Sequence, residues 1–329
     1  MPGKNRYQPL PEGTFGIIMK KKEIKNLTAS VRARLYNIAK QTGREFDAVV
    51  LQYFQERFLY RISISDFREN FILKGALLLL SRNITRFRPT KDIDLLGKKI
   101  DGSLENIKKT MEQLSMIRCD DGVIFNNKGI TVELIRKGAN YEGVRVKIEA
   151  NLGVMRRRIQ IDIGFSGIIV PAPVETDFPV ILDFPQPRIK SYTFESAIGE
   201  KFEAIVKMDY QTSRMKDFYD IYFIASKIPF ELKTLKKALI CTFADRETDI
   251  NKMRIIFDEK FKQNSMKREQ WQAFLRKNEL DFTGDFGSIV EKIKLFIMPI
   301  LDGSLEENKN YNWNFNNWKW LEVVPGRSS

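Results

Sequence analysis

Hydrophobic and polar positions divide the chain into a helical beginning, a strand-rich middle and a helical end. A helical pattern begins at Thr28 or Ser30, where a hydroxyl side chain can cap a helix. A second helix is predicted over about residues 47–60, with Phe54 and Phe58 on one face. We interpret these two helices as a packing module that follows a loose or partly helical basic arm.

The central stretch from Phe71 to Leu96 combines a strand, a glycine turn, a helix-like run and a second strand. The second strand carries an aspartate on either side of one isoleucine. Because side chains alternate along a strand, Asp92 and Asp94 should point to the same face while Ile93 points into the core. This order of elements predicts phosphate chemistry.

Short β-like runs follow a predicted helix that Ser103 caps. The last two runs are expected to pair as antiparallel neighbours joined through residues 153–157, which brings Asp162 into the same sheet as Asp92 and Asp94. The runs cover residues 123–125, 130–135, 144–152 and 158–165.

A proline-rich stretch at residues 171–187 separates this sheet from a mainly helical end, and we expect it to be a connector or an extended arm. The tail from Tyr311 to Trp320 is rich in tryptophan, which can stack on bases but more often packs on a core. We favour packing. The sequence thus predicts an α+β protein with N-terminal helices in residues 1–65, a mixed sheet in 66–187 and a C-terminal helical domain in 188–329.

Charge and composition narrow the function. Lysine and arginine outnumber the acids by 55 to 42, which gives a net charge of +13. This balance favours a polyanionic partner such as RNA or a nucleotide, although it would also serve solubility alone. The chain has no histidine. Serine–histidine hydrolases, histidine-ligated zinc enzymes and histidine general bases are therefore excluded.

Cysteine usage and hydropathy predict a cytoplasmic location. Cys119 and Cys241 are too few for a disulfide framework, or for a zinc site without histidine. The N-terminus is polar and basic with no signal-peptide core, and no apolar run approaches the length of a membrane span. We expect no association with a membrane.

Asp92 and Asp94 are candidate metal ligands. Two carboxylates a few ångström apart repel each other unless a cation lies between them. Oxygen ligands with open positions suit Mg²⁺, which completes its shell with water and substrate phosphates. Asp162 would add a third carboxylate, as in two-metal sites that serve an attacking hydroxyl and a leaving pyrophosphate. Solvated carboxylates at a strand edge or end are the alternative interpretation.

The glycine turn and the loop after it offer contacts for phosphate. Gly75 permits a close backbone approach, and the helix that begins there presents free N–H groups to an anion. An arginine in the following basic loop would either clamp phosphate or face solvent. The loop contains Arg82, Arg86, Arg88 and Lys91.

Spacing in a later helix predicts ion pairs. Arg214 lies three residues before Asp217, and Lys216 lies four residues before Asp220, so each pair shares one helix face. Such a pair stabilises a helix by roughly 0.2–0.5 kcal/mol. The spacing does not separate this structural use from a catalytic one.

Taken in order, these pieces resemble the AbiEii/AbiGii toxin family of nucleotidyltransferases, a branch of the DNA polymerase β-like superfamily. The resemblance covers about residues 28–322, and the ordered set is specific although each piece is short. The matching segments are Leu73-Lys74-Gly75, Asp92-Ile93-Asp94 and residues 160–165 (QIDIGF), 199–201 (GEK), 214–220 (RMKDFYD), 242–248 (TFADRET) and 271–275 (WQAFL).

The resemblance implies a polymerase β-like mixed sheet and a toxin that transfers a nucleotide from an NTP to a target, with tRNA the expected target class. It further implies a bacterial toxin–antitoxin or phage-defence system, and hence a cognate antitoxin. By the same resemblance, Asp92 and Asp94 would hold Mg²⁺ in a two-metal site, and Asp162 would help to activate the acceptor hydroxyl.

Further roles follow from the resemblance. Relatives often have a second glycine or a small hydroxyl residue where Ala76 stands, so here only the Ala76 backbone would contact phosphate. Lys201 would neutralise phosphate from the helical half. The implied nucleotide-binding set is Lys74, Gly75, Ala76, Arg88, Lys201, Arg214 and Lys216, and the implied catalytic set is Asp92, Asp94, Asp162, Lys201 and Asp217.

Two other functions stay open at this point. One is transfer of the nucleotide to a protein or a small molecule. The other is a non-catalytic nucleotidyltransferase-like fold that binds RNA or a partner. The presence of all three acids argues against the second, because a decayed site tends to lose carboxylates that repel one another.

Overall fold

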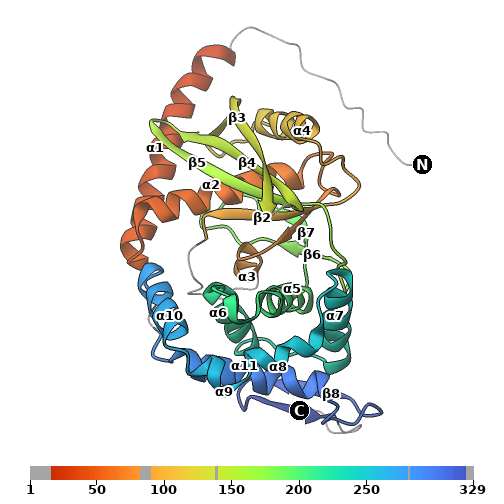
Figure 1. Cartoon of the computed structure of the whole chain (residues 1–329). Coiled ribbons are helices and arrows are strands. Elements are labelled where there is room, and N and C mark those ends of the chain that lie inside the picture. Colours follow the sequence, from red (N-terminus) through yellow and green to blue (C-terminus); the bar gives the residue numbers. More distant parts are fainter. Residues whose placement is uncertain (1–15, 82–89, 138–139, 281, 324–329) are drawn as a thin grey trace, which may run out of the picture.

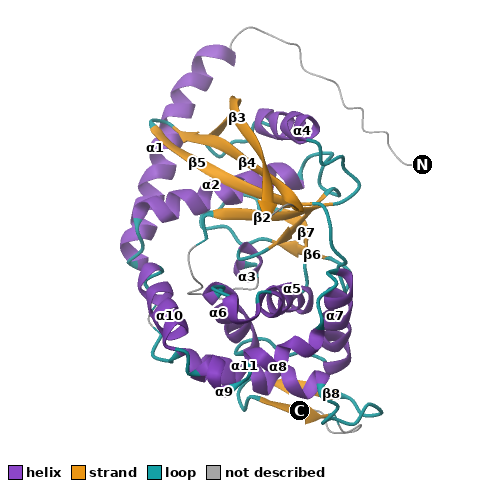
Figure 2. Ribbon diagram, viewed as in Figure 1, coloured by secondary structure: helices purple, strands orange, loops and turns teal. Residues whose placement is uncertain are grey.

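The computed structural model describes residues 16–81, 90–137, 140–280 and 282–323. A mixed sheet with the N-terminal helices occupies one half of the molecule, and a bundle of helices occupies the other (Figure 1). Colouring by secondary structure shows the same division, with a small hairpin at the far end of the helical half (Figure 2). This arrangement confirms the α+β class, with a mixed sheet between N-terminal helices and a C-terminal helical part.

Helices α1 (Gly16–Thr42) and α2 (Phe46–Ser63) correspond to the two predicted N-terminal helices. The first begins well before the expected cap at Thr28 or Ser30. Residues 17–27 contain isoleucine, methionine, lysine and glutamate and no proline, and these residue types favour continuation of a helix. The predicted start was therefore too late.

The sheet has the strand order β3-β4-β5-β2-β1-β7-β6. β2 pairs with β5 and β1 pairs with β7 in parallel, whereas the other neighbours are antiparallel. The bounds are β1 (Phe71–Lys74), β2 (Asp92–Gly97), β3 (Val123–Lys137), β4 (Asn140–Leu152), β5 (Met155–Gly164), β6 (Val174–Asp177) and β7 (Arg188–Ser191).

The structure corrects one expectation about this sheet and refines another. The runs at residues 123–125 and 130–135 form the single strand β3, because a register shift between Asn126 and Thr131 absorbs the polar residues between them. The stretch at residues 171–187 is not only a connector, since it contributes β6, which pairs with β7. The prolines around β6 are compatible with its place at the edge of the sheet.

One face of the sheet is the core of this half. Alternate residues of β4 and β5, including Val146, Ile148 and Ile161, are completely buried. Helices α2 and α4 (Leu104–Met116) pack on the sheet from this side, and Ser103 caps α4 as predicted. The intervening residues of β4 and β5 point to the opposite face and are polar.

The helical half has its own aromatic core. Trp271, Phe286 and Trp313 are almost fully buried, and Trp313 Nε1 donates to the Ala225 carbonyl at 2.7 Å. The expected packing of the tail is thus confirmed. The elements are α5 (Phe194–Lys207), α6 (Met215–Ala225), α7 (Leu232–Asp245), α8 (Met253–Ile256), α9 (Glu259–Lys262), α10 (Ser265–Lys277), α11 (Phe286–Leu301), β8 (Tyr311–Asn314) and β9 (Lys319–Glu322).

A search of the described residues for helices that are long and apolar enough to cross a bilayer finds none.

Candidate active site

The three predicted carboxylates lie on one face of two neighbouring strands. In the parallel pairing of β2 with β5, Asp94 is opposite Asp162, while Ile93 is opposite Ile161 in the core. Asp92 lies two residues before Asp94 and therefore points the same way. The structure thus brings all three acids to the polar face of the sheet.

A single cross-strand row carries this part of the site. Antiparallel pairing extends the row from Asp94 to β1 on one side, and from Asp162 to β4 on the other. Acids thus occupy the middle of the row and cations its two ends. The row consists of Lys74, Asp94, Asp162 and Arg145, on β1, β2, β5 and β4 respectively.

Gly75 packs directly against Asp94. Its φ is +69°, a left-handed conformation that favours glycine, and a Cβ placed on it would lie 2.6 Å from Asp94 Cγ. Only glycine leaves room for the carboxylate at this turn. Ala76 is buried and lies directly before the one-turn helix α3 (Leu77–Leu80). The turn therefore leads into a short helix, as predicted.

The carboxylates carry an excess of negative charge. Burial raises the pKa of Asp94 to about 6, with a further rise from Asp162, although Lys74 and Lys216 oppose the shift. Burial and Asp162 likewise raise the pKa of Asp92. A cation bound beside these side chains would relieve this repulsion.

Arg145 holds the third carboxylate. Its Nε donates to Asp162 Oδ1 at 2.9 Å and its Nη2 donates to Oδ2 at 2.8 Å, a bidentate pair. The hydrogen bonds that it donates to Asp162 raise the pKa of the guanidinium further above its usual range. Arg145 was not among the site residues predicted from the sequence. Counting back along the two strands from their tight turn would have placed residue 145 opposite residue 162.

The donor set fits a divalent cation in part. Asp92 and Asp94 offer oxygen ligands on one face beside the glycine turn, which suits Mg²⁺. Asp162 has both oxygens bonded to Arg145. Accordingly, nowhere in the described ranges do three acidic or cysteine side chains come together closely enough to hold a metal ion.

Lys74 is anchored from the helical half. Its Nζ lies 3.4 Å from Glu200 Oε2. Glu200 also accepts a hydrogen bond from the Tyr192 hydroxyl and contacts Arg246 at 2.9 Å. Burial alone would raise the pKa of Glu200, but the charges of Lys74 and Arg246 outweigh it and lower that pKa. Glu200 belongs to the GEK segment but was not among the predicted site residues.

Helices α5 and α6 form a second charged cluster beside the sheet. Lys201 Nζ lies 3.0 Å from Asp217 and 2.6 Å from Asp220, and Arg214 pairs with Asp217 at 2.8 Å as its spacing predicted. Burial acts to raise the pKa of Asp217, but the charges of Lys201 and Arg214 overcome it and hold the pKa at about 2.

Asp220 thus pairs with Lys201 of helix α5, whereas the spacing predicted Lys216 as its partner. Lys216 is exposed and lowers the pKa of both Asp92 and Asp94, so its charge acts toward the carboxylates of the sheet. The predicted phosphate contacts of Arg82, Arg86 and Arg88 lie outside the described residues.

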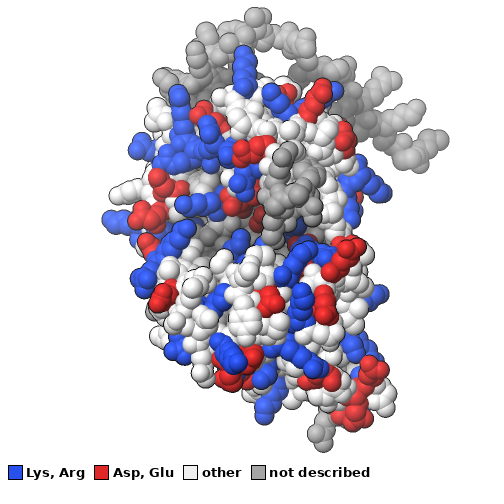
Figure 3. Space-filling model, viewed as in Figure 1, with Lys and Arg blue, Asp and Glu red and all other residues white. Residues whose placement is uncertain are grey.

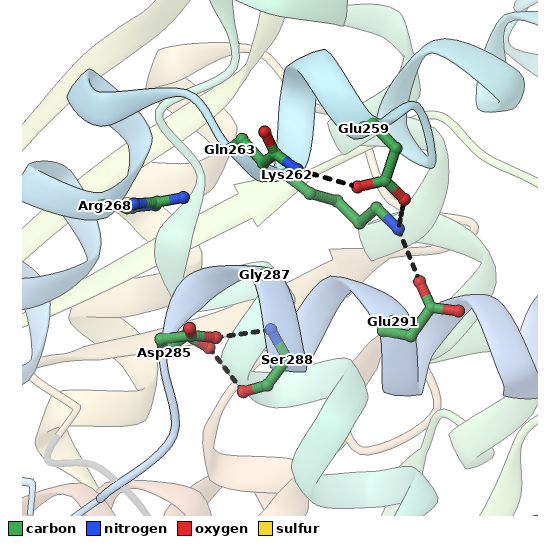
Figure 4. A pocket seen from close by; sticks show the side chains of 8 residues that line it. All are labelled: Glu259, Lys262, Gln263, Arg268, Asp285, Gly287, Ser288 and Glu291. Carbon is green, nitrogen blue, oxygen red and sulfur yellow. Dashed lines mark hydrogen bonds and ion pairs between the residues drawn. The ribbon is translucent and has the colours of Figure 1, made fainter.

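A surface pocket of about 460 Å³ is formed by α9, α10, α11 and their connections (Figure 4). Within it, Lys262 contacts both Glu259 and Glu291, and Asp285 caps α11 at Ser288. None of the described site residues lines this pocket. We assign it no part in the chemistry.

Comparison with known proteins gives one family match. The model of the family described as "Nucleotidyl transferase AbiEii toxin, Type IV TA system" matches residues 57–292, which is well over half of the chain. This segment includes every predicted site residue. A search of curated proteins finds no match.

Solved structures give more distant similarities. The nucleotidyltransferase toxin MenT4 from Mycobacterium tuberculosis is 15% identical with a TM-score of 0.48, and the match covers 84% of this chain and 98% of that one. JHP933 from Helicobacter pylori is 12% identical with a TM-score of 0.47, and the match covers 79% and 94% of the two chains. The family assignment rests on the family model, not on these similarities.

Proposed function

Because this chain belongs to the AbiEii family of nucleotidyl transferase toxins of type IV toxin–antitoxin systems, we propose that it transfers a nucleotide from an NTP to RNA, with tRNA as the acceptor class, in a reaction that depends on Mg²⁺. The observation that carries this proposal is the row of two acids between two cations, set beside a glycine turn that admits no side chain. The net charge of +13 supports a polyanionic acceptor.

The donor side of the site lies at β1 and β2. Lys74 and the backbone of Gly75 and Ala76 hold the triphosphate, while Asp92 and Asp94 hold the metal. When bound, Mg²⁺ neutralises charge on the phosphates and on the leaving pyrophosphate. The close contact between Gly75 and Asp94 keeps the triphosphate turn and the metal ligand in register.

The helical half completes the site in this proposal. Lys216 is exposed and acts on the carboxylates, so it is available to a phosphate of the NTP. Arg214 and Lys201 share Asp217, and this network fixes their charges near the sheet. Asp162 accepts the proton of the acceptor hydroxyl. Toxin families of this kind act with a cognate antitoxin. Because NTPs and RNA are found in the cytoplasm, we expect the reaction to take place there.

The proposal is tested by incubating the purified protein with Mg²⁺, each α-labelled NTP in turn and total bacterial RNA, and resolving RNA and protein separately. Label in a tRNA-sized band is the expected result and identifies the donor. The double variant Asp92→Asn/Asp94→Asn, which keeps the size of both side chains, should give no label. Label only in protein would replace RNA by a protein acceptor, and no label in any fraction would overturn the enzymatic proposal.

A further inference from the structure

Arg145 occupies the end of the carboxylate row that lies away from the triphosphate turn. The row crosses from β1 through β2 and β5 to β4, and neighbouring strands are about 4.8 Å apart. Arg145 therefore stands about 14 Å across the sheet from Lys74, with Asp162 between it and the proposed metal ligands. An NTP held at Gly75 lies on the other side of the reacting centre.

The Arg145 pair engages both oxygens of Asp162 and so competes with a reacting hydroxyl for them. Both carboxylate oxygens accept from the guanidinium, and the Gln160 amide lies 3.3 Å from one of them. The Arg145 side chain is 35% exposed, against 18% for Asp162. An incoming anion can therefore reach the guanidinium from solvent while Asp162 stays where it is.

We propose that Arg145 binds a phosphodiester of the acceptor RNA next to the reacting hydroxyl, and that this exchange of partners frees Asp162 for that hydroxyl. The inference rests on the proposed transfer to RNA. A guanidinium fork matches two phosphate oxygens as well as it matches a carboxylate. An acceptor without a phosphate beside its hydroxyl leaves the Arg145–Asp162 pair closed, so Arg145 selects nucleic acid over a protein side chain.

The outward face of β4 and β5 continues from Arg145 with further cations. Arg158 and Arg156 point to the same face as Asp162, with Arg158 about 13 Å from Asp162 along β5 and Arg156 about 7 Å further. Glu149 shares this face opposite Arg158, so the face is mixed in charge. In Figure 3 lysine and arginine side chains gather at the upper left, over the hairpin of these two strands. An acceptor strand leaving the site along β5 would meet these arginines next.

The chain offers a matched control for this experiment. Arg157 lies between the two outward arginines but points to the other face, where it pairs with Asp47 of α2. Both partners are well exposed, so the loss of this pair should change stability little. Arg157→Gln removes the same charge as Arg145→Gln from the same hairpin, without touching the carboxylate row.

The test measures binding of a fluorescein-labelled tRNA by anisotropy over a series of salt concentrations, for wild type, Arg145→Gln, Arg145→Lys and Arg157→Gln. Loss of a charged hydrogen-bonding pair should weaken binding by Arg145→Gln by about 10-fold to 100-fold. The slope of log affinity against log salt should become shallower by about 0.7–0.9, as one phosphate contact is lost. Arg145→Lys should keep the slope but bind more weakly than wild type.

Steady-state transfer gives the second readout. In Arg145→Gln the KM for RNA should rise by the same factor as the dissociation constant, while the KM for NTP stays within about twofold. Equal weakening by Arg145→Gln and Arg157→Gln, or a changed KM for NTP, would overturn the role of Arg145. Absence of transfer by the wild type would instead refute the proposed function, and the anisotropy series would still decide whether Arg145 contacts RNA.

Discussion

Asp94→Asn should make the protein more stable while it destroys transfer. The variant keeps the size of the side chain, and so the contact with Gly75, but removes a charge that the fold buries and places near Asp162. Asp94 has its pKa raised from 3.8 to about 6. At 1.36 kcal/mol per pH unit this corresponds to at most about 3 kcal/mol of destabilisation by the ionised form. Because the side chain keeps some contact with water, we expect about 2 kcal/mol.

The sign of the effect depends on pH. Above about pH 6 the carboxyl is ionised in both folded and unfolded chains, so the wild type carries the full destabilisation. Between about pH 6 and pH 4 the folded chain takes up the proton first, and the destabilisation disappears. The difference in stability between wild type and variant should therefore be largest near neutral pH, and it should disappear as the pH falls toward 4.

Urea denaturation of both proteins at several pH values measures this difference, and thermal melting should show a Tm about 3 °C higher for the variant near neutral pH. Saturating Mg²⁺ should raise the Tm of the wild type but not that of Asp94→Asn, because only the wild type keeps both ligands. A variant that is less stable than the wild type at neutral pH, or a difference that stays constant with pH, would refute this electrostatic reasoning.

Other substitutions test other parts of the site and the core. Gly75→Ala should abolish transfer because the added Cβ collides with the Asp94 carboxylate. Gly43→Ala is the control, since Gly43 also has a positive φ, +67°, but lies in open space. Equal losses of activity in the two variants would contradict the collision. Lys201→Met should lower the free energy of unfolding, measured by urea denaturation, by about 3 kcal/mol, because the completely buried Asp220 loses this cation. Adding Asp220→Asn should recover part of this loss, and additive losses would disprove the pairing. Trp313→Ala should cost about 3–5 kcal/mol, with transfer per folded molecule unchanged; a loss of transfer below the melting temperature would link the tail to the site.

The carboxylate face was predictable because it depends on local properties of the sequence. Alternation along a strand fixes which way Asp92 and Asp94 point, and a hairpin fixes the strand that carries Asp162. The turn at Gly75 was predictable for the same reason, since a glycine between a strand and a helix signals an unusual φ. The roles given to these residues stay predictions, as do the three domain boundaries.

Partners that depend on tertiary packing escaped the sequence analysis. Asp220 pairs with Lys201 because α5 and α6 pack side by side, and no spacing within one helix reveals that contact. Glu200 reaches Lys74 across more than a hundred residues of chain. Strand β6 was missed because the prolines around it mask a short edge strand, which pairs only with β7.

The order of the sheet and the helical half along the chain also determines when the charged groups of the site can come together. About 120 residues of chain separate Asp92 from Lys216, and every cation from the helical half is made after the sheet. A ribosome adds about 5–20 residues per second, so roughly 6–25 s pass between synthesis of the two. Under the proposed function, a partly made chain carries the sheet acids without the cations of the helical half and should not yet transfer nucleotides.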